Sequence, residues 1–247
     1  MARIIALANQ KGGVAKTSSA INLGAALAEL GRRVLLIDLD PQASLTAALG
    51  INPAELPASI HDVLVRKTPL PNIIVATAGL HVAPATIDLA GAEIHLFNEI
   101  GREQVLADAL ADVAEMFDDI LIDCPPSLGQ LTINALTAAD MVLVPIECSY
   151  LALRGIEQLT DTITKIRRRS NPQLHLLGVL PTMYEGRTLH EREVLAELQR
   201  RFPDQVFAPI PRSVRFRDST LAGLPLLSYD SAHPGAAAYR ALAHEVR

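Results

Sequence analysis

The sequence predicts an α/β fold: a doubly wound, mainly parallel, twisted sheet flanked by helices. Aliphatic runs bounded by turns recur along the 247 residues, and segments with helical periodicity lie between them. The runs are rich in Val, Ile and Leu without polar alternation, which is typical of parallel strands covered on both faces. Because 49% of the residues are hydrophobic and 20% charged, intrinsic disorder is excluded. No Pro/Gly/Ser-rich linker divides the chain, so we expect one domain over residues 1–247.

Strands and helices alternate in the following order. We expect strands at Arg3–Ala8, Arg33–Ile37, Ile120–Ile122, Met141–Ile146 and Leu174–Leu180. Helical periodicity predicts helices at Lys16–Leu30, Arg102–Phe117, Leu128–Ala138, Leu151–Arg169 and Leu189–Phe202. Gly31 is placed to end the first helix, and the pair Asn171-Pro172 follows the fourth. The Pro-rich segment Pro53–Asn72 is expected to be a surface excursion with one short helix.

A glycine-rich segment, NQKGGVAKTS at residues 9–18, connects the first strand to the first helix. In such a segment, consecutive backbone N–H groups and the helix N-terminus can surround a phosphate chain. Gly12 and Gly13 would let the backbone approach closely, Lys16 would reach the β- and γ-phosphates, and Thr17 would ligate Mg²⁺. The strict pattern G-x-x-x-x-G-K-[ST] has glycine where this chain has Gln10 and Ala15, so the segment predicts a variant phosphate loop.

Acidic residues follow two further strands. Asp38 and Asp40 come after the second strand, and Asp123 comes after Ile120–Ile122. The commonest role of a single Asp there is to cap the next helix. Parallel strands, however, deliver their C-terminal residues to one sheet edge, where acids can hold a metal or orient an attacking water. Three such segments at one edge favour a metal-dependent nucleotide site.

These segments resemble the ParA/Soj family of partition ATPases, a branch of the MinD/ParA superfamily with the deviant phosphate loop KGGxxK[ST]. Lys11 to Thr17 fits that loop, and the segments DLDPQ (38–42) and DCPPS (123–127) match the second and third family motifs. The resemblance extends over nearly the whole chain through Gly178–Leu189, Ile210–Arg215 and Ser231–Val246. These later segments are most similar to those of chromosomal Soj-like members.

The resemblance implies a P-loop ATPase that binds ATP and Mg²⁺ and forms a nucleotide-sandwich homodimer. The dimer would coat DNA without sequence specificity until a ParB-like partner stimulates hydrolysis, in the segregation of a chromosome or plasmid. Lys11 would act on the other subunit's nucleotide, Lys16 on its own, and Asp40 would position the water. Thr17, Asp38 and Asp123 would hold the metal. The implied nucleotide-binding residues are Lys11, Gly12, Gly13, Val14, Ala15, Lys16, Thr17 and Ser18, with Met183 and Pro211 beside the adenine.

The net charge of −5 is unevenly distributed. Residues 1–164 hold 9 basic and 19 acidic residues, whereas residues 165–217 hold 11 basic and 5 acidic. On charge alone, the basic stretch fits solvated helix faces, and Arg167–Arg169 and Arg200–Arg201 fit helix ends favoured by the macrodipole. The family resemblance instead marks Arg187, Arg212 and Arg215 for DNA, and Arg217 is an addition that the family pattern does not supply. We therefore expect this stretch to form one face of the ATP-bound dimer.

Two positions depart from the family pattern. Ala15 stands where most relatives have glycine, and a positive φ would cost alanine about 1 kcal/mol, so we predict a helical or bridge conformation there. Residues Phe216–Gly223 read FRDSTLAG instead of the usual acidic stretch, which adds Arg217.

Other functions on the same fold are a MinD-like positioning ATPase and a ligase of the dethiobiotin-synthetase kind. The first would end in a basic amphipathic helix, and the second would need a substrate pocket; neither is visible in the sequence. Cys124 and Cys148 are expected to be small buried residues and not ligands of a cluster. With no signal peptide and no apolar run of about 20 residues, we expect a cytoplasmic, nucleoid-associated protein without stable membrane association.

Overall fold

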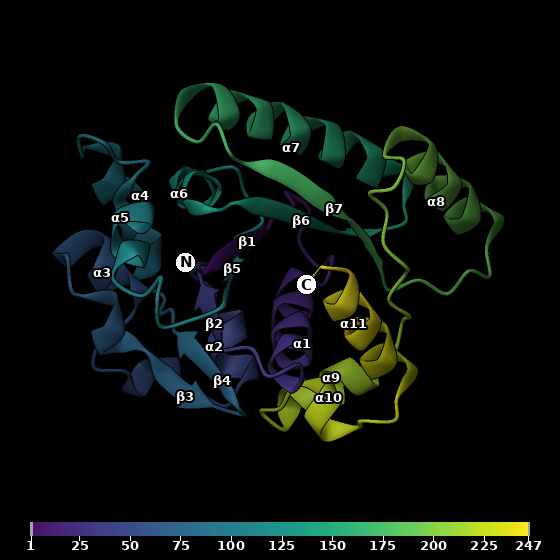
Figure 1. Ribbon diagram of the computed structural model, residues 1–247, viewed down its shortest axis with the longest axis horizontal. Helices are drawn as coiled ribbons and strands as arrows, with labels where there is room; N and C mark the ends of the chain where they lie inside the picture. The colour runs from purple at the N-terminus through teal and green to yellow at the C-terminus, as the bar shows by residue number, and fades with distance from the viewer. Residues whose placement is uncertain (1, 247) are drawn as a thin grey trace.

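A computed structural model describes residues 2–246, in which a seven-stranded sheet has the order β3-β4-β2-β5-β1-β6-β7 (Figure 1). β3 runs antiparallel to β4, and every other neighbouring pair is parallel. The predicted doubly wound fold is therefore confirmed. The strands are β1 Arg3–Leu7, β2 Val34–Asp38, β3 Val75–Thr77, β4 Leu80–Ala83, β5 Asp119–Asp123, β6 Met141–Glu147 and β7 His175–Thr182.

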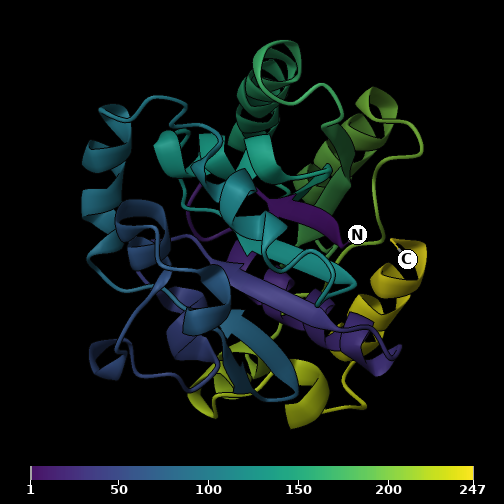
Figure 2. The same ribbon diagram turned by 60° about the vertical axis from the view of Figure 1, so that its left-hand side comes forward.

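Helices cover both faces of the sheet, each over its own apolar core. α1, α2, α10 and α11 pack on one face, and α3 to α8 pack on the other. In Figures 1 and 2 the C-terminal helices (yellow) lie across the sheet from α7 and α8 (green). The helices are α1 Lys16–Glu29, α2 Ser44–Ala48, α3 Ile60–Arg66, α4 Leu89–Phe97, α5 Val105–Ala111, α6 Gln130–Ala138, α7 Tyr150–Arg169, α8 Leu189–Arg201, α9 Arg215–Leu221, α10 Leu226–Tyr229 and α11 Pro234–Glu245.

All five predicted strands and all five predicted helices are present, with shifted ends. The largest shift is in α5, which covers only Val105–Ala111 of the predicted Arg102–Phe117. Pro53–Asn72 does contain one short α-helix, and most of the segment lies at the surface, as predicted, although one side of the helix packs inward. Ile60 and Leu64 of α3 are fully buried in the core, because this segment covers part of the sheet. The β3–β4 hairpin and the helices α2, α4 and α9 to α11 were not predicted from the sequence.

β7 carries a short extension that directs the chain back to the carboxyl edge of the sheet. The Val179 N–H donates to the Gln205 carbonyl at 2.7 Å, and the Phe207 N–H donates to the Val179 carbonyl at 2.9 Å. A Cβ at Gly178 would lie 2.7 Å from that Gln205 carbonyl oxygen and 2.6 Å from the Phe207 ring. Glycine at 178 therefore permits this close approach, which places the residues after 207 near the phosphate loop.

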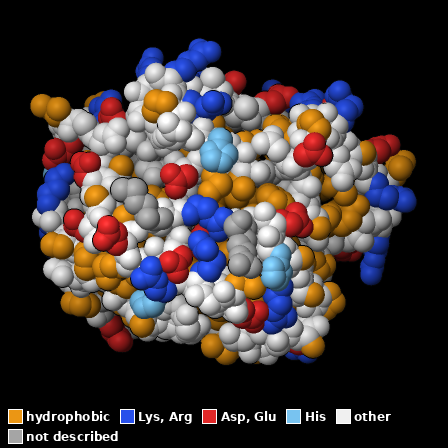
Figure 3. Space-filling view, viewed as in Figure 1, with side chains coloured by type: hydrophobic (Ala, Val, Ile, Leu, Met, Phe, Trp, Pro, Cys, Tyr) orange, Lys and Arg blue, Asp and Glu red, His pale blue; other side chains and the backbone are white. Residues whose placement is uncertain are grey.

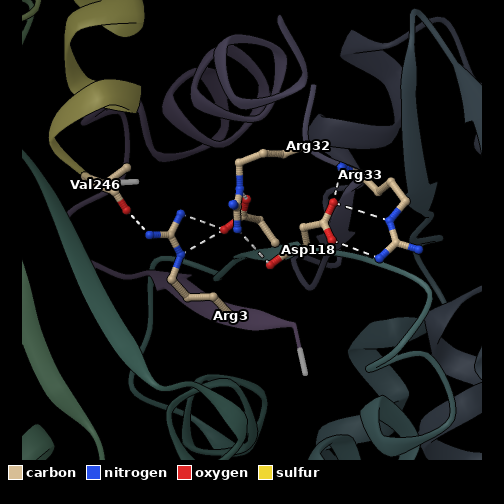
Figure 4. A network of polar contacts seen from close by, with 6 residues as sticks. Arg3, Arg32, Arg33, Asp118 and Val246 are labelled. Atoms are coloured by element: carbon tan, nitrogen blue, oxygen red, sulfur yellow. Dashed lines mark hydrogen bonds and ion pairs between the residues drawn. The ribbon is translucent and has the colours of Figure 1, made fainter. Parts of the chain in front are cut away.

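A network of ion pairs joins the opposite, amino edge of the sheet (Figure 4). Arg3 and Arg32 both donate to the fully buried carboxylate of Asp119, and Arg3 also donates to the Val246 carbonyl. Arg33 donates to Asp118 at 2.8 Å, and these hydrogen bonds lower the Asp118 pKa to about 2. Figure 3 shows several Lys and Arg side chains close together near the middle of this face of the molecule. The pairing with acids gives these arginines a role in holding β1, β2 and β5 to the C-terminal segment.

Candidate functional site

The segment between β1 and α1 alternates between right-handed and left-handed backbone. Gly13 has φ of 72° and Ala15, the residue that precedes α1, has φ of 61° and ψ of 33°. The prediction of a helical or bridge conformation at Ala15 was therefore wrong. The methyl group tolerates the left-handed position at a cost of about 1–2 kcal/mol, and the Ala15 carbonyl accepts the first hydrogen bond of α1, from Ser19. Such alternation turns successive N–H groups toward one concave side, where an anion binds.

This concave side opens into a pocket of about 480 Å³ at the carboxyl edge of the sheet. Of the residues predicted to bind nucleotide or act in catalysis, it is lined by Gly12, Gly13, Ala15, Lys16, Thr17, Ser18, Asp40, Met183 and Pro211. Val14 is buried beneath the loop, where its carbonyl accepts a hydrogen bond from the Thr182 hydroxyl at 3.1 Å. The structure thus brings together residues that are up to about 200 positions apart in the sequence.

Lys16 is buried at the floor of the loop, 6% exposed. Its Nζ lies 3.3 Å from the Lys11 carbonyl oxygen, and burial lowers the pKa of the amine although Asp123 opposes the shift. A buried amine with one neutral hydrogen-bond partner needs a counter-anion. A phosphate chain in the pocket would supply that negative charge.

The acids at the ends of β2 and β5 are neighbours, since Asp38 and Asp123 are register partners in the sheet. The Thr17 hydroxyl donates to Asp123 Oδ2 at 2.7 Å, while Asp123 Oδ1 is buried without a hydrogen-bond partner. Burial raises the Asp123 pKa to about 8, and the charge of Asp38 adds to the effect. A buried carboxylate with a free oxygen, beside a threonine hydroxyl, is a set of ligands that fits Mg²⁺. The residues present therefore fit the metal.

Asp38 has a different environment from Asp123. Its carboxylate accepts from the Thr46 N–H at 2.9 Å, from the Thr46 hydroxyl at 2.7 Å and from the Asp40 N–H at 3.2 Å. Burial raises its pKa to about 6, against these hydrogen bonds. The three donors make Asp38 the anchor of residues 39–46, and its predicted place among the metal-holding residues stays a prediction.

Asp40 is held at the side of the pocket by its own turn. Its Oδ1 accepts from the Gln42 N–H at 2.9 Å, which fixes the side chain beside the phosphate loop. The other carboxylate oxygen is left to contact a bound molecule or water. This geometry is compatible with the water-positioning role that the sequence predicts for Asp40.

The outer end of the pocket is more apolar than its floor. Met183 and Pro211 both line the pocket, and the Tyr184 N–H joins their segments by donating to the Ile210 carbonyl at 3.0 Å. Their place beside the adenine stays a prediction. Phe216 and Tyr239, which were not predicted, line the same pocket with their rings 6.0 Å apart in an edge contact. Phe216 belongs to the segment that departs from the family pattern, so that departure contributes to the wall of the pocket.

His233 supports this wall from behind. Its Nδ1 accepts from the Gly235 N–H at 2.9 Å, so in the neutral ring Nε2 carries the proton and donates to the Ser213 hydroxyl at 3.0 Å. Ser213 also accepts from the Arg215 N–H at 3.2 Å. Because both contacts use the oxygen as an acceptor, the Ser213 hydroxyl keeps its own proton for a molecule in the pocket.

Lys11 is absent from the lining of this pocket and lies at its rim, with 39% of its side chain exposed. Its Nζ contacts Glu147 Oε2 at 2.6 Å and the Ser149 hydroxyl at 3.4 Å. The two lysines of the phosphate loop therefore point to different places: Lys16 lies inside the pocket of its own subunit and Lys11 outside it.

The predicted DNA-binding arginines lie around the same edge of the sheet. Arg212 and Arg217 line the pocket, Arg187 lies 3.7 Å from Glu185, and Arg215 lies 3.5 Å from Asp218. The rest of the basic stretch is elsewhere. Arg167–Arg169 and Arg200–Arg201 do end α7 and α8, as predicted, and those ends belong to the opposite edge. That residues 165–217 form one face of the ATP-bound dimer therefore stays a prediction, and helices α7 and α8 carry part of the charge away from the site.

Cys124 and Cys148 are both free and buried, and burial raises the pKa of each thiol. They are small core residues, as predicted. Across residues 2–246, the structure has no helix with the length and apolarity that a membrane span requires.

Comparison with known proteins identifies the family. A family described as an AAA domain matches residues 2–176. The chain is 47% identical to the sporulation initiation inhibitor protein Soj of Bacillus subtilis, over 100% of this chain and 98% of Soj. It is 45% identical to the chromosome partitioning protein ParA of Myxococcus xanthus, over 99% of this chain and 87% of ParA.

Solved structures share the fold and, in several cases, hold nucleotide. A Mycobacterium smegmatis protein described as cobyrinic acid a,c-diamide synthase, with bound ADP and magnesium, is 48% identical with a TM-score of 0.86; the match covers 99% of this chain and 93% of that one. The septum site-determining protein MinD of Pyrococcus horikoshii, complexed with Mg-ADP, is 27% identical with a TM-score of 0.83, over 100% of this chain and 96% of MinD. The chain therefore belongs to the ParA/Soj family and is an ATPase that uses ATP and Mg²⁺.

Proposed function

We propose that this ATPase partitions DNA. Binding of Mg-ATP joins two copies into a sandwich dimer, the dimer binds DNA without sequence specificity, and a ParB-like partner stimulates hydrolysis and releases the DNA. The names of the relatives, Soj and chromosome partitioning protein ParA, support this assignment.

The observation that carries the proposal is the separation of the two lysines. Lys16 lies in the pocket of its own subunit, whereas Lys11 lies at the rim with its amine outside. Phosphoryl transfer needs positive charge on the phosphate oxygens in the transition state. In our proposal Lys11 supplies that charge to the nucleotide of the second subunit, so hydrolysis requires the dimer.

Other residues of the chain bind the nucleotide, the metal, the attacking water and the DNA. The N–H groups from Gly12 to Thr17 and the Lys16 amine bind the phosphates, and Met183 and Pro211 flank the base. Thr17 and Asp123 hold Mg²⁺, which when bound spreads positive charge over the β- and γ-phosphates. Asp40 orients the attacking water. Arg187, Arg212, Arg215 and Arg217 contact DNA phosphates near the dimer.

A ligase is the competing assignment, since three solved structures that are 46–48% identical to this chain carry the name of a synthase. A ligase on this fold would need a second substrate next to the γ-phosphate. Among the described residues, the second cavity holds about 340 Å³ and is lined in part by Arg33, Met116 and Phe117. Those residues precede β2 and β5 and lie at the amino edge of the sheet, away from the phosphate loop. This second cavity therefore offers no site for a substrate beside the phosphate loop.

Three measurements on variants test the proposal: nucleotide titration, sedimentation velocity with Mg-ATP, and the rate of ATP turnover. Lys16→Ala should weaken ATP binding about 10- to 100-fold, because it removes the charged partner of the phosphates. Lys11→Ala should bind ATP like the wild type and stay monomeric. Asp40→Ala should bind ATP, dimerise and lose about 10²- to 10⁴-fold in turnover.

Each outcome has a clear converse. If Lys11→Ala dimerised and hydrolysed ATP normally, the lysine would not act across an interface. If the wild type stayed monomeric with ATP, the sandwich would be wrong. ATP-dependent binding to lipid vesicles in place of DNA would instead support a MinD-like positioning ATPase.

A further inference from the structure

The amine of Lys11 is held within its own subunit by Glu147, the last residue of β6. The distance from Lys11 Nζ to Glu147 Oε2 is 2.6 Å, and the Ser149 hydroxyl lies 3.4 Å from the same amine. The Asn9 side chain accepts the Lys11 N–H at 3.0 Å, which fixes the backbone from which the lysine extends. In the single subunit, Lys11 is therefore already paired with an acid.

The same carboxylate has a second cationic neighbour. Arg212 Nη2 lies 3.4 Å from Glu147 Oε1, and Arg212 Nε lies 3.2 Å from Glu185 Oε1. Arg212 is positioned by the backbone, because its N–H donates to the Tyr184 carbonyl at 3.2 Å. If Lys11 left Glu147, Arg212 would remain beside the carboxylate, so the pair can open without leaving an unpaired charge.

We propose that Glu147 is a latch: it holds Lys11 in the single subunit and releases it when the nucleotide of a second subunit competes for the amine. The inference rests on the proposed action of Lys11 across the dimer. A bound triphosphate carries more negative charge than one carboxylate, so it can displace Glu147. Glu147 is a positioning residue that raises the concentration of ATP-bound subunits needed for a dimer.

The effect of the Lys11–Glu147 ion pair on dimerisation is limited, because both side chains are partly exposed to solvent. The side chains of Lys11 and Glu147 are 39% and 31% exposed, so solvent screens their attraction. Exposed ion pairs typically change an equilibrium by about 1.4- to 5-fold. Because both subunits must open their latch, we expect a change of roughly 2- to 30-fold in the dimer dissociation constant.

The test compares Glu147→Gln with the wild type by sedimentation velocity, with Mg²⁺ and a non-hydrolysable ATP analogue. Gln keeps the shape and the acceptor oxygen but removes the charge, so the dimer should tighten roughly 2- to 30-fold at low salt. The difference should shrink at about 0.5 M salt, since screening weakens the pair in the wild type. The matched control is Glu185→Gln. Glu185 also contacts Arg212 but not Lys11, so this variant should leave the dimer dissociation constant unchanged.

An unchanged or weaker dimer in Glu147→Gln would overturn the latch. A weaker dimer would show that Glu147 supports the interface, and equal changes in both variants would show a general effect of charge. Labelling with an amine-reactive reagent separates the latch from the proposed function. In nucleotide-free protein, Lys11 should react about 1.4- to 5-fold faster in Glu147→Gln. Equal labelling would overturn the ion pair itself, whatever the wild type does with ATP.

Discussion

At the scale of single residues, the site could be predicted wherever a residue type implies its chemistry. Lys16, Thr17 and Asp123 lie together as their motifs predict, because strands β1 and β5 end at the same edge. The backbone at Ala15 was predicted wrongly, since the loop imposes a left-handed position that alanine does not favour. No local pattern marks the pairing of Lys11 with Glu147, which are 136 positions apart.

Asp123→Asn tests the metal site through stability. The Asp123 pKa rises in the folded protein from 3.8 to about 8, chiefly through burial. The folded state therefore binds the proton more tightly, and this contribution to stability is full below about pH 4 and is lost as the pH rises through 8. Without nucleotide, the Asn variant should be more stable than the wild type at pH 8, by on the order of 1–3 kcal/mol, and equal to it near pH 4.

Denaturant unfolding at several pH values measures this difference, and calorimetric titration of ATP with and without Mg²⁺ measures the function. In the Asn variant Mg²⁺ should no longer strengthen ATP binding. Identical pH profiles for the two proteins would contradict the raised pKa of Asp123, and an intact Mg²⁺ effect in the variant would remove Asp123 from the metal site.

At the scale of elements, the buried aliphatic strands and the longest helices could be predicted, although α11, with 12 residues, was missed. α7 and α8 have strong periodicity and clear ends, whereas β3 and β4 have three and four residues and turn at Ala78-Gly79. The extension of β7 that returns the chain to the pocket depends on the close approach of Gly178 to Gln205. A sequence pattern does not reveal such an approach, because the partners become neighbours only after α8 has packed.

Gly178→Ala should therefore affect both stability and the site. The added methyl group would lie 2.7 Å from the Gln205 carbonyl oxygen, so the strand and the returning segment must separate. We expect a loss of about 1–3 kcal/mol in unfolding free energy and weaker ATP binding. The control is Gly91→Ala in α4, where a Cβ meets nothing within 4 Å and should stabilise the helix by about 0.5–1 kcal/mol. If the two variants had equal stability and affinity, the close approach at Gly178 would have no role.

At the scale of the whole molecule, the charge is arranged by edge of the sheet. The arginines near the pocket lie at the carboxyl edge, while those at the ends of α7 and α8 lie at the other. The net charge of −5 gives no sign of this arrangement. The distribution of basic and acidic residues along the sequence indicates it only in part. Helix direction decides which basic residues lie beside the ATP site, where we propose that DNA binds.

Charge reversal at the two edges tests this arrangement. Arg215→Glu, at the carboxyl edge, should weaken DNA binding for all sequences alike. The slope of the logarithm of DNA affinity against the logarithm of salt concentration should fall in magnitude by roughly 1 for each DNA phosphate that is no longer neutralised. Arg168→Glu, near the end of α7, has the same charge change at the other edge and should leave binding nearly unchanged. Fluorescence anisotropy with two unrelated duplexes over a salt series gives both quantities. Equal weakening in the two variants would mean that net charge, and not the carboxyl edge, determines binding.

The central claim is that ATP switches this protein onto DNA, and one assay tests it most directly. The wild type is titrated onto a DNA duplex of arbitrary sequence with Mg²⁺ and ATP, with ADP, or without nucleotide. We expect the protein to bind DNA only in the condition with Mg²⁺ and ATP. The affinity should be similar for unrelated sequences and should decrease strongly as the salt concentration rises. Equal binding in all three conditions, or none in any of them, would contradict the claim.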